Sequence, residues 1–235
     1  MCIRGDTTRR LLKDRPMITL RGSRKAHNLK MKKRVAIGIR VHSGWGALVA
    51  VSGDPGSEEV IERERIIIVD TKTPGVSQPY HFAQKLNLRE GEKKAEQHVK
   101  KCAETSAQTA LVTVREIVKR LRDRDYNIVV AAILLGLGRP LPSFAKILAS
   151  HPMLHTAEGV FFRQAFRDAF ERLAIPVTSI PERQLEERVG EVFAKKAPGV
   201  QRRIAAMGRT LGPPWTLDQK SAALGAMIVL AESRR

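Results

Sequence analysis

The chain has 235 residues, of which 43% are hydrophobic, and this length and composition are typical of one compact globular domain with an extension. Its longest apolar runs, 128–137 and 222–231, are shorter than the ~20 residues that a membrane-spanning helix needs, so we interpret both as buried core. The two cysteines, Cys2 and Cys102, lie far apart without a metal-ligand spacing. They argue against a disulfide scaffold or a structural zinc site and favour a reducing, cytoplasmic environment.

The chain is strongly basic, with a formal net charge of +18 from 42 Lys and Arg against 24 Asp and Glu. Residues 1–34 alone hold 12 basic and two acidic residues. Because residues 1–33 lack a sustained periodicity, we expect a disordered basic arm there and a folded domain over 34–235. Basic side chains release condensed counterions when they meet phosphates, so DNA or RNA is the expected partner. A charge excess that only solubilises the chain is the alternative.

Three strands are expected in the first part of the domain, with short turns between them. Alternating or apolar runs predict strands over 35–41, 47–51 and 60–69, and the tight Ser43-Gly44 turn joins the first two. Three such strands in a row form an antiparallel meander. Residues 71–91, which are rich in Pro and Gly, are expected to form a loop.

A long helix and a buried strand follow. Small and apolar residues recur at helical spacing over 92–123, and the small ones allow the helix to approach a sheet closely. The continuous apolar run 126–135 predicts a strand covered on both faces. The expected inner stripe of the helix consists of Val99, Cys102, Ser106, Ala110, Val114, Ile117 and Leu121.

The second half of the chain alternates helices with one more strand. Ser143 and Thr156 are candidate N-caps for helices over 144–149 and 157–173, and a strand is expected over 175–180. A basic helical stretch covers 185–207. After a Gly-Pro-Pro linker, Thr216 and Gln219 form a capping box for the last helix.

This element order resembles that of the ribonuclease H-like superfamily. Within it the chain is most similar to RuvC-type Holliday-junction resolvases over 35–230. The stretches 35–39 and 43–48 resemble the family's "GIDPG…TGWG" motif, and 217–224 resembles its "DxxDAL" motif. The resemblance implies an α/β fold with a mixed sheet, an antiparallel three-strand meander plus parallel strands, flanked by helices. Whether the chain forms a homodimer, as the resolvases do, is left open.

The resemblance also implies a two-metal nuclease site, which needs three or four convergent carboxylates. Arg40 or Val41 occupies the position of the first carboxylate, and the strand over 127–135 contains no acid. Asp218 is the one acid at a matching position and the candidate metal ligand. Its alternative role is a favourable interaction with the dipole of the last helix.

Other acids could rebuild a catalytic set with Asp218, namely Asp70, Glu158 or Glu104, although each is also explained as a solvated charge or a helix cap. Magnesium would be needed only in that case. An arginine at the metal position repels a cation and can hold a phosphate instead. The expected nucleic-acid contacts are therefore Arg40, His42, Arg139, Lys32, Lys33 and Arg34.

Two further patterns carry less weight. His151, His155 and Glu158 have spacings found in zinc sites, but Pro152 and the Thr156 cap indicate that the histidines straddle a helix start, which favours loop packing. The loop Gly136-x-Gly138-Arg139 lacks the GK[ST] element of a phosphate loop, and no G-x-S-x-G nucleophile elbow occurs.

Three hypotheses follow from the sequence. The first is a nucleic-acid-binding, catalytically degenerate ribonuclease H-like protein. The second is an active metal-dependent endonuclease on DNA or RNA, and the third is a protein-interaction scaffold in a larger assembly.

Overall fold

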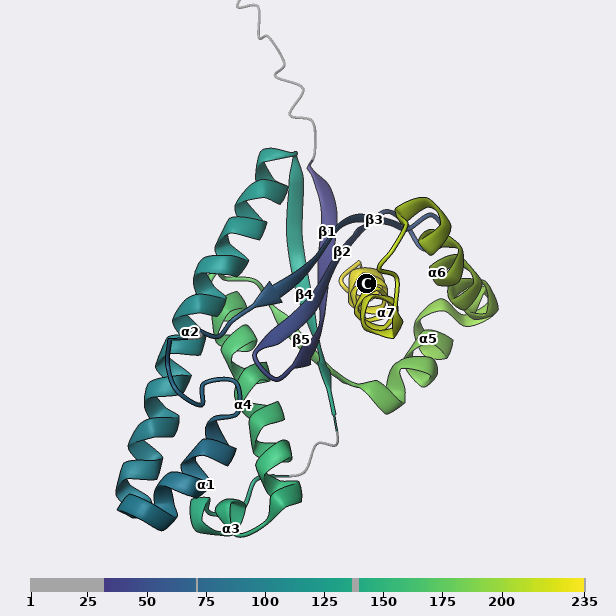
Figure 1. Ribbon diagram of the computed structural model, residues 1–235. Helices are drawn as coiled ribbons and strands as arrows, with labels where there is room; N and C mark the ends of the chain where they lie inside the picture. The colour runs from purple at the N-terminus through teal and green to yellow at the C-terminus, as the bar shows by residue number, and fades with distance from the viewer. Residues whose placement is uncertain (1–31, 71, 137–139, 235) are drawn as a thin grey trace, which may run out of the picture. The chain divides into compact units, whose positions relative to one another are not determined.

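The computed structural model describes residues 32–70, 72–136 and 140–234. Within these ranges one mixed sheet has the strand order β3-β2-β1-β4-β5 (Figure 1). The β3-β2-β1 meander is antiparallel, whereas β4 pairs parallel with both β1 and β5. This arrangement confirms the ribonuclease H-like α/β fold. The strands are β1 Lys33–His42, β2 Trp45–Ser52, β3 Glu59–Ile67, β4 Tyr126–Leu135 and β5 Val177–Pro181.

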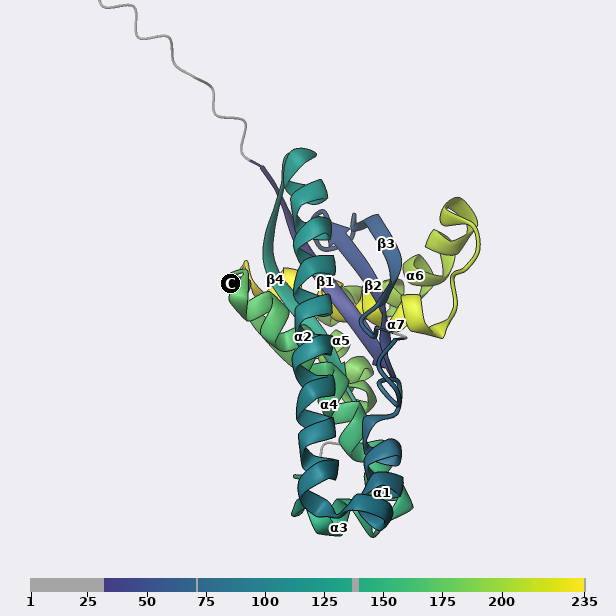
Figure 2. The ribbon, with the colours of Figure 1, turned by 60° about the vertical axis from the view of Figure 1, so that its left-hand side comes forward.

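Helices cover both faces of the sheet. In Figures 1 and 2, α2 and α4 lie on one face, whereas α7 lies on the other with α5 and α6 beyond it. The short helices α1 and α3 pack beside the far ends of α2 and α4, away from the sheet. The α-helices are α1 Pro79–Glu90, α2 Glu92–Asp123, α3 Phe144–Leu148, α4 His151–Arg172, α5 Leu185–Phe193, α6 Ala197–Leu211 and α7 Leu217–Glu232.

The alternation of β1 side chains divides the core into two layers. Val35, Ile37 and Ile39 belong to the apolar cluster that β1 shares with α2 and α4. Ala36 instead belongs to the cluster that contains α7. Since side chains alternate along a strand, Arg40 and His42 emerge on the α7 side. The register of β1 therefore directs both polar side chains toward the start of α7.

Helix α7 is the most deeply buried helix of the described chain. Residues 221–230 are all buried, and they pack against β1, β2 and β4. At its N-terminus the backbone N–H of Thr216 donates to Gln219 Oε1 at 2.9 Å. The predicted capping box is thereby confirmed, and it places Asp218 in the first turn.

Two elements at the end of the molecule away from the sheet, α1 and the start of α4, differ from the prediction. Helix α1 forms within the range 71–91, where a loop was expected, because proline is tolerated in a first helical turn and Ala83 is buried against a small apolar cluster. Helix α4 begins at His151 rather than near 157. Thr156 is therefore not an N-cap but lies inside the helix, where its Oγ1 donates to the Pro152 carbonyl at 2.9 Å.

Further boundaries differ by smaller amounts. The basic stretch 185–207 is divided into α5 and α6 by a 3-10 turn at Ala194–Lys196, just before Pro198, which cannot continue the preceding helix. Strand β1 starts at Lys33, so the last residue of the expected arm belongs to the sheet. The rest of that arm, residues 1–31, lies outside the described residues.

Candidate nucleic-acid interface

Charged side chains meet at the edge of the sheet where the parallel strands end. Arg40 and His42 lie at the carboxyl end of β1, and Glu182 directly follows β5. Asp218 reaches the same edge from the first turn of α7. In α/β proteins with parallel strands, ligands bind outside the carboxyl ends of the strands. This edge is therefore the natural position for a functional site.

The guanidinium of Arg40 is held between two carboxylates. Its Nε and Nη2 donate to Glu182 Oε2 at 3.1 and 2.9 Å, and its Nη1 donates to Asp218 Oδ1. The same Asp218 oxygen lies 2.9 Å from His42 Nε2. Arg40 is 20% exposed and Asp218 22% exposed, so solvent screens this network only in part.

The network changes the acidity of its members. Burial acts to raise the pKa of Asp218, but the hydrogen bonds and charges of Arg40 and His42 outweigh burial and hold that pKa below its ordinary value. For Arg40, the hydrogen bond to Glu182 is the largest influence. That bond, together with Asp218, raises the pKa of Arg40 against the opposing effect of burial. At neutral pH Arg40 and Asp218 therefore form a pair of opposite charges.

An aromatic and cationic stack borders this network on the β1–β2 hairpin. The rings of His42 and Trp45 are stacked with centroids 4.2 Å apart. The guanidinium of Arg65, from β3, lies 4.0 Å from the centroid of the Trp45 ring, at a distance typical of a cation–π interaction. The stack fixes the orientation of the His42 ring beside Asp218.

Arg163 approaches the same edge from α4. Burial lowers the pKa of its guanidinium, and the charge of Glu182 opposes this effect. Among the described residues the Arg163 guanidinium has no hydrogen-bond or ion-pair partner. With Arg167 and Ser179 it lines a hollow between α4 and the ends of β4 and β5. A partly buried arginine with no carboxylate within ion-pair distance in the described chain is suited to binding an anion such as a phosphate.

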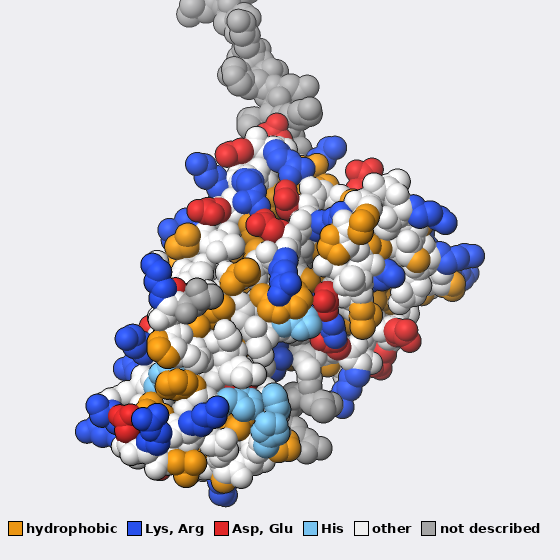
Figure 3. Space-filling model, viewed as in Figure 1, with side chains coloured by type: hydrophobic (Ala, Val, Ile, Leu, Met, Phe, Trp, Pro, Cys, Tyr) orange, Lys and Arg blue, Asp and Glu red, His pale blue; other side chains and the backbone are white. Residues whose placement is uncertain are grey.

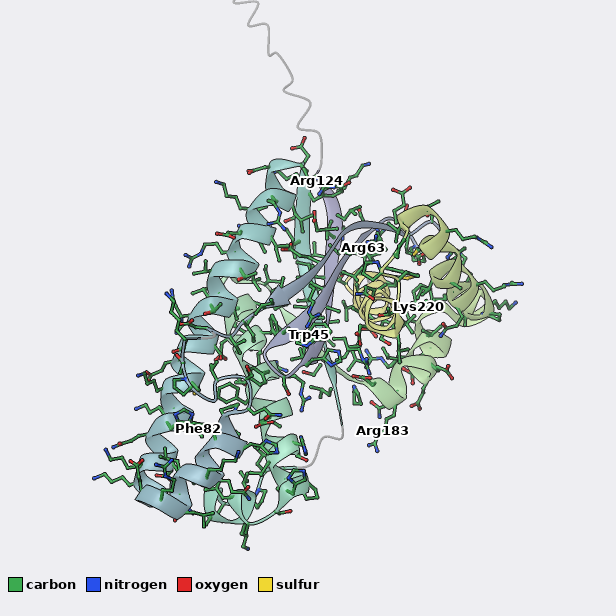
Figure 4. All side chains as sticks on the ribbon, in the orientation of Figure 1. Trp45, Arg63, Phe82, Arg124, Arg183 and Lys220 are labelled. Atoms are coloured by element: carbon green, nitrogen blue, oxygen red, sulfur yellow. The ribbon has the colours of Figure 1, made fainter. Side chains whose placement is uncertain are left out.

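A second, open groove continues the edge on the α7 side. Glu182 and Ser221 line it, and so do the basic residues Arg183 and Lys220. Figure 4 shows Arg183 shortly after the end of β5 and Lys220 at the start of α7. Arg183 is exposed and Lys220 is half-buried. The groove therefore brings two further cations beside the Arg40 network.

The acids that the sequence offered as a catalytic set do not come together with Asp218. Asp70 Oδ1 accepts a hydrogen bond from the Lys72 backbone at 2.9 Å. Glu158 is buried in α4 and bound to His81, and Glu104 is exposed on α2. Within the described chain, the one group of three side chains whose potential ligand atoms lie close enough for a shared metal consists of histidines.

The predicted nucleic-acid contacts fall into two separate regions. Lys32, Lys33 and Arg34 lie at the opposite end of β1, where Arg34 donates to the Ser233 carbonyl at 2.6 Å. A strand rises ~3.3 Å per residue, so Arg34 and Arg40 are roughly 20 Å apart. Arg139 belongs to 137–139, which lies outside the described residues.

Sequence reasoning missed Glu182 and Arg163. A signal for Glu182 was present, because it lies two residues after the last predicted strand, 175–180, whose carboxyl end is expected at the same edge as that of the first strand. Arg163 carried no comparable signal, since one arginine on a helix rich in charged residues does not stand out. The position of Arg163 at this edge depends on how α4 packs against the sheet.

Comparisons with known proteins address the fold. Neither a protein-family model nor a curated protein matches the sequence. The structure is similar to Thermus thermophilus RuvC in complex with Holliday junction substrate, with a TM-score of 0.51 and 12% identity over 86% of this chain and 95% of that chain. A second Thermus thermophilus RuvC structure gives a TM-score of 0.49 at 12% identity over 85% and 95% of the two chains. No helix in the described ranges is long and apolar enough to cross a bilayer.

Proposed function

We propose that this ribonuclease H-like protein binds nucleic acid at the carboxyl edge of its sheet without cleaving it. The observation that carries the proposal is the position of Arg40, which the motif resemblance aligns with the first metal-binding carboxylate. There its guanidinium is paired with Asp218 and Glu182. A cation in that position repels a metal ion and already occupies the two carboxylates that such an ion would need.

Phosphate contacts are assigned to the cations around this ion pair. Within the described residues, three of the five N–H groups of Arg40 donate to carboxylates. The other two remain available for a ligand. Arg163 keeps its whole guanidinium free of protein acceptors in the part of the chain that the structure describes. Arg183 and Lys220 extend the basic surface along the groove.

The fold and the charge support this assignment from two independent directions. The similar RuvC structure contains a Holliday junction, which makes a four-way DNA junction a suitable first probe. The net charge of +18 favours a polyanionic partner over a neutral or acidic one. The basic cluster of Lys32, Lys33 and Arg34 at the opposite edge gives a second point of contact for a long nucleic acid.

The test is a salt titration of binding. Fluorescence anisotropy with a labelled four-way junction, and with single-stranded DNA and RNA, measures affinity between low and moderate salt. Each phosphate contact contributes roughly 0.9 to the slope of log K against log salt. The variant R163Q/K220Q is expected to bind more weakly and to lower the slope by about 2. The matched control R115Q/K119Q removes the same charge from exposed positions on α2 and should leave the slope nearly unchanged.

Two other results would replace the proposal with its rivals. Cleavage of any of these probes with magnesium or manganese, abolished by Asp218→Ala, would establish the nuclease. Absence of salt-dependent binding at low ionic strength would leave the scaffold, with the charge serving solubility alone. Equal weakening by both double variants would mean that binding is non-specific and not centred on this edge.

A further inference from the structure

Three histidine side chains from two helices converge at the end of the molecule remote from the Arg40 network. His81 lies in the first turn of α1, and His151 and His155 lie four residues apart near the start of α4. One ring nitrogen of each lies within 4.8 Å of the others, and the Nε2 atoms of His151 and His155 are 3.1 Å apart. Figure 3 shows pale-blue histidine side chains gathered on the surface over this helical end.

The start of α4 explains how this convergence arises. Because α4 begins at His151, residues 151 and 155 are one helical turn apart and project from the same face. Helix α1 packs against both α3 and α4 at this level, and Gln84 Nε2 of α1 donates to the carbonyl of Leu148, the last residue of α3, at 2.6 Å. The His81 ring lies edge-on to both other rings, with centroids 5.2 Å from His151 and 4.7 Å from His155.

A buried carboxylate orients one of the three rings. Glu158 is 1% exposed, and its Oε1 lies 2.8 Å from His81 Nδ1 and 3.3 Å from the His81 backbone nitrogen. A proton on Nδ1 satisfies this contact and leaves the lone pair of Nε2 free to bind a ligand. The other oxygen of Glu158, Oε2, is buried without a hydrogen-bond partner in the described structure.

A buried carboxylate with one unpartnered oxygen is costly unless positive charge lies nearby. The pair of Glu158 and His81 supplies such charge when the imidazole is protonated, and a metal ion on the outer nitrogen of His81 supplies it in another way. Metal-binding histidines commonly donate their second N–H to a carboxylate in this arrangement. The orphaned oxygen and the oriented ring therefore both indicate a cation at the histidine cluster.

We propose that His81, His151 and His155 form a binding site for a divalent transition-metal ion of the zinc class, with Glu158 as the positioning residue. Imidazole nitrogens suit Zn²⁺, Cu²⁺ and Ni²⁺, whereas Mg²⁺ prefers oxygen. Two nitrogens bound to one tetrahedral Zn²⁺ lie ~3.3 Å apart, close to the separation of the His151 and His155 nitrogens. Three protein ligands leave the fourth position to water or another small ligand.

The metal would connect α1 to α4 where the apolar core is small. The buried cluster at this end contains six residues, three of which are alanines, so it buries little apolar surface. A metal bound by both helices in the folded state alone stabilises that state by mass action. The bound metal would therefore hold α1 against the start of α4.

The experiment uses the full chain without an affinity tag, stripped of metal by a chelator. Calorimetric titration with Zn²⁺ and the absorption spectrum with Co²⁺ are expected to give one tetrahedral site per chain. Zinc should also raise the melting temperature by several degrees. In H151N/H155N, which changes two exposed side chains, Zn²⁺ affinity should fall at least 100-fold and the thermal shift should disappear. Glu158→Gln should weaken binding roughly 10- to 100-fold without changing the stoichiometry.

His98→Asn is the matched control. His98 lies on α2, where its ring packs against Phe82, and it is not a member of the cluster. Because H151N/H155N keeps His98, both cysteines and all of residues 1–31, metal bound by those groups would persist in the double variant. Equal zinc binding by the wild type and H151N/H155N, loss of binding in His98→Asn, or no 1:1 binding by the wild type would each overturn the proposal.

Discussion

Gly38 in β1 and Ala222 in α7 approach so closely that no side chain fits between them. A Cβ atom added to Gly38 would lie 1.9 Å from the Ala222 carbonyl oxygen. Gly38→Ala is expected to destabilise the fold by at least about 3 kcal/mol, because the obstacle is backbone rather than a flexible side chain. Denaturant unfolding measures the change.

Gly190→Ala is the control for this prediction. Gly190 lies inside α5, and a Cβ there would meet nothing within 4 Å. Since alanine is the better helix former, this variant should gain roughly 0.5–1 kcal/mol. Similar effects of the two substitutions would contradict the close packing of α7 on β1.

Replacing the central cation by an acid tests the interpretation of the Arg40 network. Arg40→Asp removes the partner of Asp218 and Glu182 and adds a third carboxylate, so the variant is expected to lose about 2–4 kcal/mol. A hard oxygen-binding cation should relieve this repulsion. Millimolar Mg²⁺ should therefore raise the melting temperature of Arg40→Asp by several degrees and leave the wild type nearly unchanged. If Mg²⁺ affects both proteins alike, the carboxylates are not placed to share a cation.

The pKa of Asp218 predicts a pH dependence of stability. In the folded state this pKa lies below its ordinary value of 3.8. The ionised carboxylate therefore stabilises the fold above that pH, and the contribution is lost as the pH falls through the lower, folded-state pKa. Urea unfolding should show the wild type more stable than Asp218→Asn near pH 6, with the difference shrinking below pH 4. In an Arg40→Met background the same comparison should vary less with pH, because a main cause of the shift is gone.

Arg63 is expected to hold the linker between α6 and α7. Its guanidinium donates to the carbonyls of Leu211 and Pro214, both at 2.6 Å, and of Gly212 at 2.9 Å. Figure 4 shows Arg63 on the sheet beside this linker. Arg63→Met should cost about 1–3 kcal/mol and increase amide hydrogen exchange in α6. Arg65→Met, on the same strand, should leave exchange in α6 unchanged. Equal increases in exchange for the two variants would show that Arg63 does not hold the linker.

The sequence predicted the elements whose local pattern agrees with their final environment. The boundaries 92–123 and 126–135 match α2 and β4 because a long amphipathic stripe and a continuous apolar run are strong local signals. Helix α1 was missed because its proline and polar residues resemble a loop, and only packing of Ala83 against the start of α4 explains the helix. The late start predicted for α4 had the same origin, since Pro152 was interpreted as a break.

The candidate site was predictable in part. The motif resemblance identified Arg40 and Asp218 as occupants of one edge, because the first strand and last helix of that fold meet there. It did not identify Glu182 as the second partner of Arg40, since that contact depends on how β5 pairs with β4. The histidine cluster was also predictable only in part. The spacing of His151 and His155 was noted, but loop packing was favoured, which is wrong because both residues lie inside α4. His81 is 70 positions from His151 and lies in the helix that was missed.

The position of α7 has a consequence for synthesis on the ribosome. The sheet is complete once β5 has been made, but one of its faces stays uncovered until residues 217–232 emerge from the exit tunnel. Nascent chains that stop before that point expose Ala36, Val49 and Val130, which belong to the cluster that α7 covers. The core between the sheet and α7 can therefore be completed only after nearly all of the described chain has been synthesised.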